Sequence, residues 1–449
     1  MKPRPPNPIW PLLVNAAYAA AALVGWPYYL YLLATRQKYR AGLGERWGRV
    51  PRFKTGPAPR FWVHCISVGE VEAARTFIPA LAKAYPAADI VVSTTTQTGR
   101  RRARERFPDL AVFHFPLDLW PCVRRALGRI KPSAVIQVES EWWPNFFFAA
   151  ARRRIPVVCV NVRITERGAR GYRRIRPIMR AVFNTCRAIG VQAEVYRRRL
   201  EALGADTDRV RVTGQMKHDG VVFADTVAGV EDLARDMKIE PGERVLVAGS
   251  IGPGEEEMLL QAYQQVRRLY PRLRLVLVPR RPENFDAAAQ AVVAAGLGVV
   301  RRSRTTVWEG SKRLPPVILG DTMGELMKWY ALADVVFVGR SLVPIGGSNP
   351  MEPGSLGKPL VWGPHMFNFP VEAPALVEAG AACQVSTAQE LADTVADLLT
   401  RPDRRRQMGD AARETIRRMQ GATARSVDLV RRVLAEASVG PGAGPEETR

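Results

Sequence analysis

The sequence has few of the residues that build a disulfide framework or a zinc site. Its 449 residues include five cysteines and four histidines. The cysteines are scattered, mostly within apolar runs, at Cys65, Cys122, Cys159, Cys186 and Cys383. Because no CxxC pair and no cysteine–histidine ligand spacing occurs, we expect neither a disulfide frame nor a metal centre. This cysteine usage fits a reducing compartment.

Acidic residues are scarce relative to basic ones. Lysine and arginine number 66 against 43 aspartates and glutamates, which gives a formal net charge of +23. Such an excess favours a polyanionic neighbour, although an arginine-rich proteome is an alternative explanation. The basic residues are spread along the chain, without the compact basic module of a nucleic-acid-binding protein, so we expect no nucleic acid partner.

One long segment, Ile9 to Leu33, has no charged residue at all. As a helix it would be long enough to cross ~30 Å of hydrocarbon, and tryptophan and tyrosine stand near its ends, as in interfacial anchors. Pro11, Asn15 and Pro27 weaken a straight span, so a helix lying on the membrane is the alternative. Five basic residues follow the segment by Arg49 and two precede it, which places the rest of the chain in the cytoplasm.

Short apolar runs alternate with helical segments from residue 61 onward. Continuous apolar runs of this kind are typical of buried parallel strands, so the pattern predicts an α/β fold of two Rossmann-like, doubly wound domains facing a cleft. The first series is Phe61–Ile66, Ile90–Thr95, Ala134–Val138, Val157–Asn161, Ala188–Gln192 and Val210–Thr213. The second is Arg244–Ala248, Leu273–Val278, Val317–Leu319, Val335–Val338 and Leu360–Trp362.

The predicted organisation has four parts. Residues 1–35 form the hydrophobic anchor, residues 36–225 the first domain and residues 226–420 the second. Residues 421–449 are predicted to be a C-terminal helix followed by a disordered tail. In sheets of this class ligands bind beyond the carboxyl ends of the strands, so the polar residues there are the candidates for function.

In the first domain, candidate residues follow three of the predicted strands. Glu70 begins a helix and is either a partner of the helix dipole or a general base that deprotonates a hydroxyl. Glu139 and Glu141 directly follow a strand. Residues two apart in an extended chain share a face, so we expect both carboxylates to address one site. Lys217 lies just beyond the last strand of this series.

In the second domain, two glycine-containing turns follow strands. Backbone N–H groups in the turn Gly320–Leu326 favour phosphate, and the glycines of Gly346–Pro353 permit close approach of a ligand. Glu352 has the position of an acidic residue that binds ribose hydroxyls. Arg280 and Arg281 offer cations for a phosphate or a carboxylate. The turn before Glu255 matches no phosphate-binding loop and is interpreted as a helix cap.

Together these motifs resemble those of the bacterial 3-deoxy-D-manno-octulosonic acid (Kdo) transferases, inverting glycosyltransferases with the GT-B fold. The resemblance runs from the basic segment after the anchor to about residue 420. It rests on SVGE, TTTQTG, ESEWWPN, NVRITERGARGY, VTGQMKHD, PRRPENF, DTMGELMKWYALADVVFVG and LVPIGGSNPMEP through GKPLVWGPHMFNF.

The resemblance implies a reaction and its participants. Kdo would pass from CMP-Kdo to a lipid A precursor (lipid IVA) at the cytoplasmic face of the bacterial inner membrane, without cofactor or metal. Glu70 would be the general base, and Glu139 and Lys217 would stabilise the transition state. The implied CMP contacts are Arg280, Arg281, Met323, Gly324, Glu325, Asn349, Pro350, Met351 and Glu352.

The chain departs from the family pattern on the donor side. Arg281 and Ser348 stand where histidine is common, Ser250 to Gly252 replace a Ser-Thr-His run, and His218 replaces an aromatic residue. Two alternatives remain open at this level. One is a GT-B enzyme that uses another nucleotide sugar, and the other is a non-enzymatic, membrane-anchored protein that binds polyanions.

Overall fold

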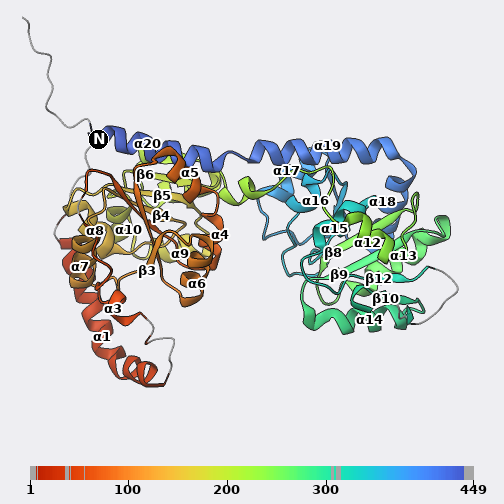
Figure 1. The fold of residues 1–449 in the computed structure, drawn as a ribbon, viewed down its shortest axis with the longest axis horizontal. Helices are drawn as coiled ribbons and strands as arrows, with labels where there is room; N and C mark the ends of the chain where they lie inside the picture. Colours follow the sequence, from red (N-terminus) through yellow and green to blue (C-terminus); the bar gives the residue numbers. More distant parts are fainter. Residues whose placement is uncertain are drawn as a thin grey trace, which may run out of the picture. The chain divides into compact units, whose positions relative to one another are not determined.

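The computed structural model describes residues 7, 9–35, 40, 42–54, 56–304, 308–309 and 315–438. It divides the chain into two compact units (Figure 1). Unit 1 comprises Met1–Gly220 and Met419–Arg449, and unit 2 comprises Val221–Arg418. The predicted C-terminal tail beyond residue 438, and Arg36 and Lys38 after the anchor, lie outside the described residues.

Unit 1 is built on a seven-stranded sheet in which every pairing is parallel, in the order β3-β2-β1-β4-β5-β6-β7. The predicted alternation of strand and helix is therefore confirmed for this half. Edge strand β3 was not predicted, because its four residues form no long apolar run. The strands are β1 Arg60–His64, β2 Asp89–Thr94, β3 Ala111–His114, β4 Ala134–Val138, β5 Val157–Val162, β6 Ala188–Val191 and β7 Val210–Val212.

Helices cover both faces of this sheet, so every residue of its central strands β4 and β5 is buried. They are α1 Ile9–Thr35, α3 Leu43–Arg46, α4 Val68–Ala73, α5 Phe77–Ala84, α6 Gln97–Arg106, α7 Trp120–Ile130, α8 Pro144–Arg152, α9 Glu166–Arg173, α10 Arg176–Phe183, α11 Glu194–Ala202 and α20 Ala422–Ser438, with the 3-10 turns η1 Thr207–Arg209 and η2 Met216–Gly220.

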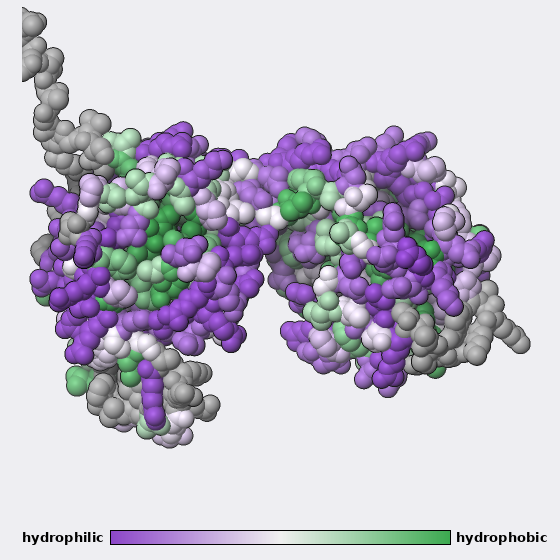
Figure 2. All heavy atoms as spheres, viewed as in Figure 1, coloured by the Kyte–Doolittle hydropathy of each residue, from purple (hydrophilic) through white to green (hydrophobic). Residues whose placement is uncertain are grey.

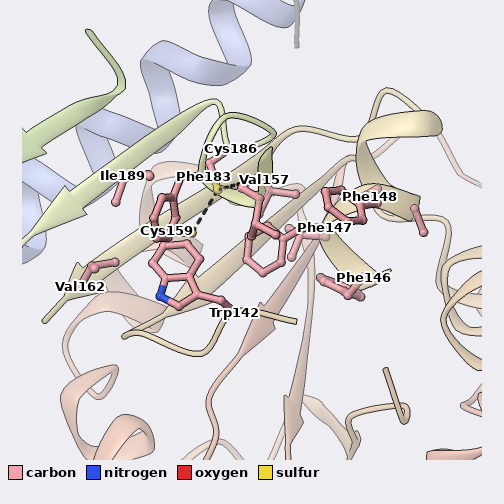
Figure 3. Packing of buried hydrophobic residues seen from close by; sticks show 14 of the residues in the cluster. Trp142, Phe146, Phe147, Phe148, Val157, Cys159, Val162, Phe183, Cys186 and Ile189 are labelled. Atoms are coloured by element: carbon pink, nitrogen blue, oxygen red, sulfur yellow. Dashed lines mark hydrogen bonds between the residues drawn. The ribbon is translucent and has the colours of Figure 1, made fainter. Parts of the chain in front are cut away.

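One of the two apolar clusters of unit 1 is rich in aromatic rings. Trp142 meets Phe183 edge to face, with ring centroids 4.8 Å apart (Figure 3). In the same cluster the thiols of Cys159 and Cys186 lie 3.7 Å apart, and both cysteines are free. The buried rings and thiols of this cluster form an apolar core on this face of the sheet.

Helix α1 docks on unit 1 through its amino-terminal half. Val14 is buried in the aromatic cluster, and the Asn15 amide donates to Asn145 Oδ1 at 3.0 Å. The Tyr18 hydroxyl donates to the buried Asp118 carboxylate at 3.0 Å. Burial raises the pKa of Asp118 to about 7, against backbone N–H bonds that lower it. The docked half of α1 thus has polar partners that its sequence does not reveal.

The remaining part of α1 exposes several large apolar side chains. Leu23 and Val24 are 81% and 86% exposed, and Tyr28 and Tyr31 are exposed as well. The part of the chain that the structure describes contains no helix with the length and apolarity that a membrane crossing requires.

Unit 2 contains an eight-stranded sheet in the order β11-β10-β12-β9-β8-β13-β14-β15, parallel except for the β10–β11 pair. Its five inner strands correspond to the predicted ones, and the three that were not predicted are short strands at the edges. The strands are β8 Val245–Ile251, β9 Arg274–Pro279, β10 Val299–Arg301, β11 Trp308–Glu309, β12 Val317–Leu319, β13 Val335–Val338, β14 Leu360–Trp362 and β15 Ala382–Gln384.

The helices of unit 2 enclose a core that includes the fully buried Tyr263. They are α12 Val230–Asp236, α13 Glu256–Leu269, α14 Phe285–Ala294, α15 Leu326–Leu332, α16 Met351–Ser355, α17 Glu372–Glu378, α18 Ala388–Thr400 and α19 Pro402–Met419, with η3 Pro282–Asn284 and η4 Arg302–Arg304. In the view of Figure 2, hydrophilic residues cover most of the surface of each unit.

After α19 the chain returns to unit 1 as α20. This helix packs on α5, and Val427 and Val430 are buried in the second apolar cluster of unit 1. Asp219 caps its amino terminus by accepting the backbone N–H of Gly421 at 2.6 Å and that of Thr423. The segment that contains Lys217 is therefore tied to the carboxyl-terminal helix.

Candidate functional site

Glu70 lies at the amino terminus of α4, directly after β1. Its Oε2 accepts the backbone N–H of Ser67 at 2.8 Å, while Ser67 Oγ accepts the N–H of Gly69 at 3.3 Å, so the two side chains form a capping box. The capping role considered from the sequence is thus real. Glu70 Oε1 has no hydrogen-bond partner among the described residues, which leaves one oxygen for other chemistry.

Glu139 directly follows β4 and has a left-handed backbone conformation, with φ of 65°. Asn161 Nδ2 donates to its Oε1 at 3.3 Å. Burial raises the pKa of Glu139, and the nearby charge of Glu70 raises it further, while Lys217 and Arg163 oppose this. The structure therefore brings the three predicted catalytic residues of unit 1 into one electrostatic cluster.

Lys217 lies in η2, and hydrogen bonds with other segments of the chain hold this turn. Asn161 Oδ1 accepts the backbone N–H of Met216 at 3.0 Å, and Asp219 caps α20. Asn161 is fully buried, with φ of 58°, and its amide therefore bonds both Glu139 and the turn that contains Lys217. Sequence reasoning missed this residue, although its place at the carboxyl end of a predicted strand is where ligand-site residues gather.

Glu141 has different neighbours from Glu139. Its Oε2 accepts Trp143 Nε1 at 2.9 Å and lies 3.9 Å from Nε2 of the buried His64. The prediction that Glu139 and Glu141 share one face assumed an extended chain. That assumption is wrong, because Glu139 has a left-handed backbone that turns the chain between them.

In unit 2 a fully buried carboxylate gathers two loops. Glu255 accepts backbone N–H groups from Gly252 at 2.8 Å, Ser341 at 2.7 Å and Leu342 at 2.9 Å, and also from Arg340. These residues follow β8 and β13. The sequence predicts only a helix cap here, whereas the structure shows a carboxylate that orders loops from two neighbouring strands.

Several predicted nucleotide contacts cluster near these loops. The Asn349 amide donates to Glu352 Oε1 at 3.1 Å, which orients that carboxylate. Burial raises the pKa of the Tyr330 phenol, and the negative charge of Glu352 raises it further. The positive charge of Arg280 acts in the opposite direction. Glu352 and Arg280 therefore both lie near this phenol. Pro350 and Met351 lie at the start of α16, beside Glu352. Arg281 is exposed and pairs with an exposed glutamate.

Glu325 is engaged in ion pairs. Its carboxylate accepts Arg302 Nε at 3.0 Å and lies 3.5 Å from Lys328 Nζ. Burial acts to raise the pKa of Glu325, but the hydrogen bonds from Arg302 and Thr322 hold it below the ordinary value. A ligand at this turn would meet its backbone and the exposed Met323 and Gly324 rather than this carboxylate.

Among the described residues no group of histidine, cysteine, aspartate and glutamate side chains is arranged to hold a metal ion.

The two parallel sheets flanked by helices define the architecture of GT-B glycosyltransferases. The structure of a glycosyltransferase from Rickettsia africae superimposes with a TM-score of 0.57 at 10% identity, over 86% of this chain and all of that one. At such low identity this likeness shows the fold alone. It confirms the predicted GT-B class.

Sequence comparison defines the family. The family model described as 3-Deoxy-D-manno-octulosonic-acid transferase (kdotransferase) matches residues 41–220. The chain is 34% identical over 400 residues to the 3-deoxy-D-manno-octulosonic acid transferase of Haemophilus influenzae, covering 88% of this chain and 92% of that protein. It is 32% identical over 429 residues to the 3-deoxy-D-manno-octulosonic acid transferase of Bordetella pertussis, covering 91% of this chain and 97% of that protein. The chain therefore belongs to the Kdo transferase family, and the non-enzymatic alternative is excluded.

Proposed function

We propose that this Kdo transferase moves Kdo from CMP-Kdo to lipid IVA, a lipid A precursor, by direct displacement with inversion. The observation that carries the proposal is the cluster of Glu70, Glu139 and Lys217 beyond the carboxyl ends of the strands of unit 1. Glu70 accepts the proton of a glucosamine hydroxyl through its free oxygen. Lys217 supplies positive charge where negative charge develops in the transition state, and Glu139 orients and balances that cation.

Unit 2 binds the nucleotide in this proposal. Glu352, oriented by Asn349, accepts the ribose hydroxyls, and Arg280 and Arg281 meet the phosphate. Arginine in place of the common histidine at Arg281 keeps a cation at all physiological pH values. Backbone N–H groups at Met323 and Gly324 complete the pocket, without a role for a metal or a cofactor.

The direct test uses purified protein with CMP-Kdo and lipid IVA in detergent. We expect release of CMP that requires both substrates, and mass spectrometry of the lipid shows each added Kdo directly. Transfer from a UDP-sugar without transfer from CMP-Kdo contradicts the proposal and supports the alternative of another nucleotide sugar.

The ribose contact predicts a specific binding defect. Glu352→Ala removes the acceptor of the ribose hydroxyls, so we expect CMP and CMP-Kdo to bind more weakly by the same factor, about tenfold or more. Isothermal titration calorimetry measures both affinities. Glu378→Ala, an exposed glutamate of the same unit, is the control. Unchanged CMP affinity in the Glu352 variant rules out this contact.

We further propose that the exposed part of α1 lies in the interface of the bacterial inner membrane, on the cytoplasmic face. The transfer of exposed apolar side chains from water into lipid lowers the free energy, and basic residues nearby attract anionic headgroups. Arg176 and Arg180 line a cavity of about 490 Å³ beside Trp10, and neither has a carboxylate partner among the described residues. They are suited to a phosphate of the acceptor or of the membrane.

The membrane proposal predicts a change in vesicle binding. Leu23→Asp with Val24→Asp places charge where the exposed apolar surface is largest, so binding to phosphatidylglycerol-containing vesicles should fall strongly, and further at high salt. Co-sedimentation measures it, with Leu269→Asp, an exposed leucine of unit 2, as control. The double substitution keeps the contacts of the docked half of α1, whereas deletion of residues 1–34 removes them. Undiminished vesicle binding at high salt would place the anchor elsewhere.

A further inference from the structure

Glu141 is a held carboxylate with one free oxygen. It lies in the loop between β4 and α8, and its side chain is 31% exposed. The indole N–H of Trp143 fixes Oε2 at 2.9 Å. The other oxygen, Oε1, has no hydrogen-bond partner in the described part of the chain. The Glu141 side chain cannot rotate without losing its hydrogen bond from Trp143. An oriented carboxylate oxygen with no donor is a ready acceptor for a ligand hydroxyl.

His64 indicates that a polar partner is missing here. The ring is fully buried and stacked on Phe115, with centroids 3.9 Å apart. Its Nδ1 lies 3.1 Å from the carbonyl oxygen and 2.9 Å from the hydroxyl oxygen of Ser93. Its Nε2 has no hydrogen-bond partner and faces Glu141 Oε2 at 3.9 Å. A buried imidazole nitrogen without a hydrogen-bond partner beside an oriented carboxylate is a polar group that a bound ligand can satisfy.

Aromatic rings flank the same carboxylate. Trp143 is partly buried against the aromatic cluster, and Tyr172 of α9 is close enough that the charge of Glu141, after burial, raises the pKa of its phenol. Aromatic rings offer flat apolar surfaces to the C–H groups of a sugar, while a carboxylate accepts its hydroxyl hydrogens. A pyranose ring has both kinds of group.

Along the chain, Glu141 lies between Glu139 and the residue that contacts α1. Glu141 is two residues beyond Glu139, a member of the catalytic cluster. It is four residues before Asn145, which bonds Asn15 of α1 at 3.0 Å. The loop that contains Glu141 is therefore connected to the proposed catalytic cluster and, through Asn145, to the docked half of α1.

We propose that Glu141, with Trp143 and Tyr172, forms a subsite for a glucosamine ring of the acceptor, whose hydroxyls donate to the carboxylate. This inference rests on the proposed function, because it assumes a lipid-linked glucosamine acceptor. The subsite holds the acceptor ring and takes no part in the bond-making step.

The test is Glu141→Gln, in which the amide oxygen still accepts the Trp143 N–H but the charge is lost. We expect KM for lipid IVA to rise about tenfold, while kcat and KM for CMP-Kdo stay unchanged. Tyr172→Phe should raise the acceptor KM by a smaller factor. Glu166→Gln, an exposed glutamate of α9 with no ion pair among the described residues, is the matched control and should behave as wild type.

A soluble probe separates ring binding from membrane partition. Calorimetry with the glucosamine disaccharide lacking acyl chains should show the same loss in the Glu141 variant. If wild type transfers Kdo but the variant keeps its acceptor KM, the subsite is wrong. A fall in kcat with an unchanged KM also overturns it, because Glu141 then acts in the chemistry. If wild type transfers no Kdo to lipid IVA, the proposed function itself fails.

Discussion

Glu70→Gln is expected to lower turnover about 10²–10⁴-fold with the fold intact. Glutamine cannot take the proton of the acceptor hydroxyl, but its amide oxygen can still accept the N–H of Ser67, as glutamine does in capping boxes. Stability is therefore preserved, and the effect isolates the chemistry. The measurement is kcat with both substrates saturating, together with the thermal melting temperature.

A matched control exists on the same helix. Glu72 pairs with Arg102 on the flank of α4, and Glu72→Gln removes the same charge without touching the proposed base. We expect turnover within about twofold of wild type in this variant, because a partly exposed ion pair contributes little to stability. Near-normal turnover in Glu70→Gln would show that another group removes the proton.

Glu255→Gln is expected to damage unit 2 itself. The wild-type carboxylate accepts four backbone N–H groups with its two oxygens, whereas glutamine has one oxygen and an NH₂ group that would face N–H donors. Leaving these buried N–H donors unpaired lowers the free energy of unfolding by about 3 kcal/mol in total. We expect a lower melting temperature and loss of CMP binding, since the affected loops follow β8 and β13.

The control for this variant is Glu257→Gln, an exposed position on the same helix, α13. Calorimetry with CMP and thermal unfolding measure the two effects. If Glu255→Gln melts and binds CMP as wild type does, the four hydrogen bonds do not order the loops that follow β8 and β13 for the proposed CMP binding.

The sequence predicted the strands that are central and apolar. The predicted run Val157–Asn161 agrees with β5 to one residue, because a strand buried on both faces needs a continuous apolar run. The edge strands β3 and β15 lack that requirement and were missed, although the edge strand β7 was predicted as Val210–Thr213. Local pattern is therefore sufficient for the interior of each sheet but finds its edge strands only in part.

The candidate site could likewise be predicted from the sequence only in part. Glu70 and Glu139 were identifiable because they follow apolar runs, where such sheets place ligands. The left-handed backbone at Glu139 and the Asn161 bridge to Met216 depend on contacts between distant segments, which no local pattern encodes. The same holds for the docking of Tyr18 on Asp118, a contact between residues 100 positions apart.

The return of α20 to unit 1 has a consequence for domain dissection. The chain crosses between the units twice, at residues 220–221 and 418–419, so neither half of the gene encodes a complete unit 1. A fragment ending at Gly220 would expose the apolar surface that Val427 and Val430 cover, and Asp219 would lose the backbone groups that it caps. Unit 2 is contiguous and can be excised. Expression of unit 1 alone instead requires residues 1–220 fused through a short linker to residues 419–438.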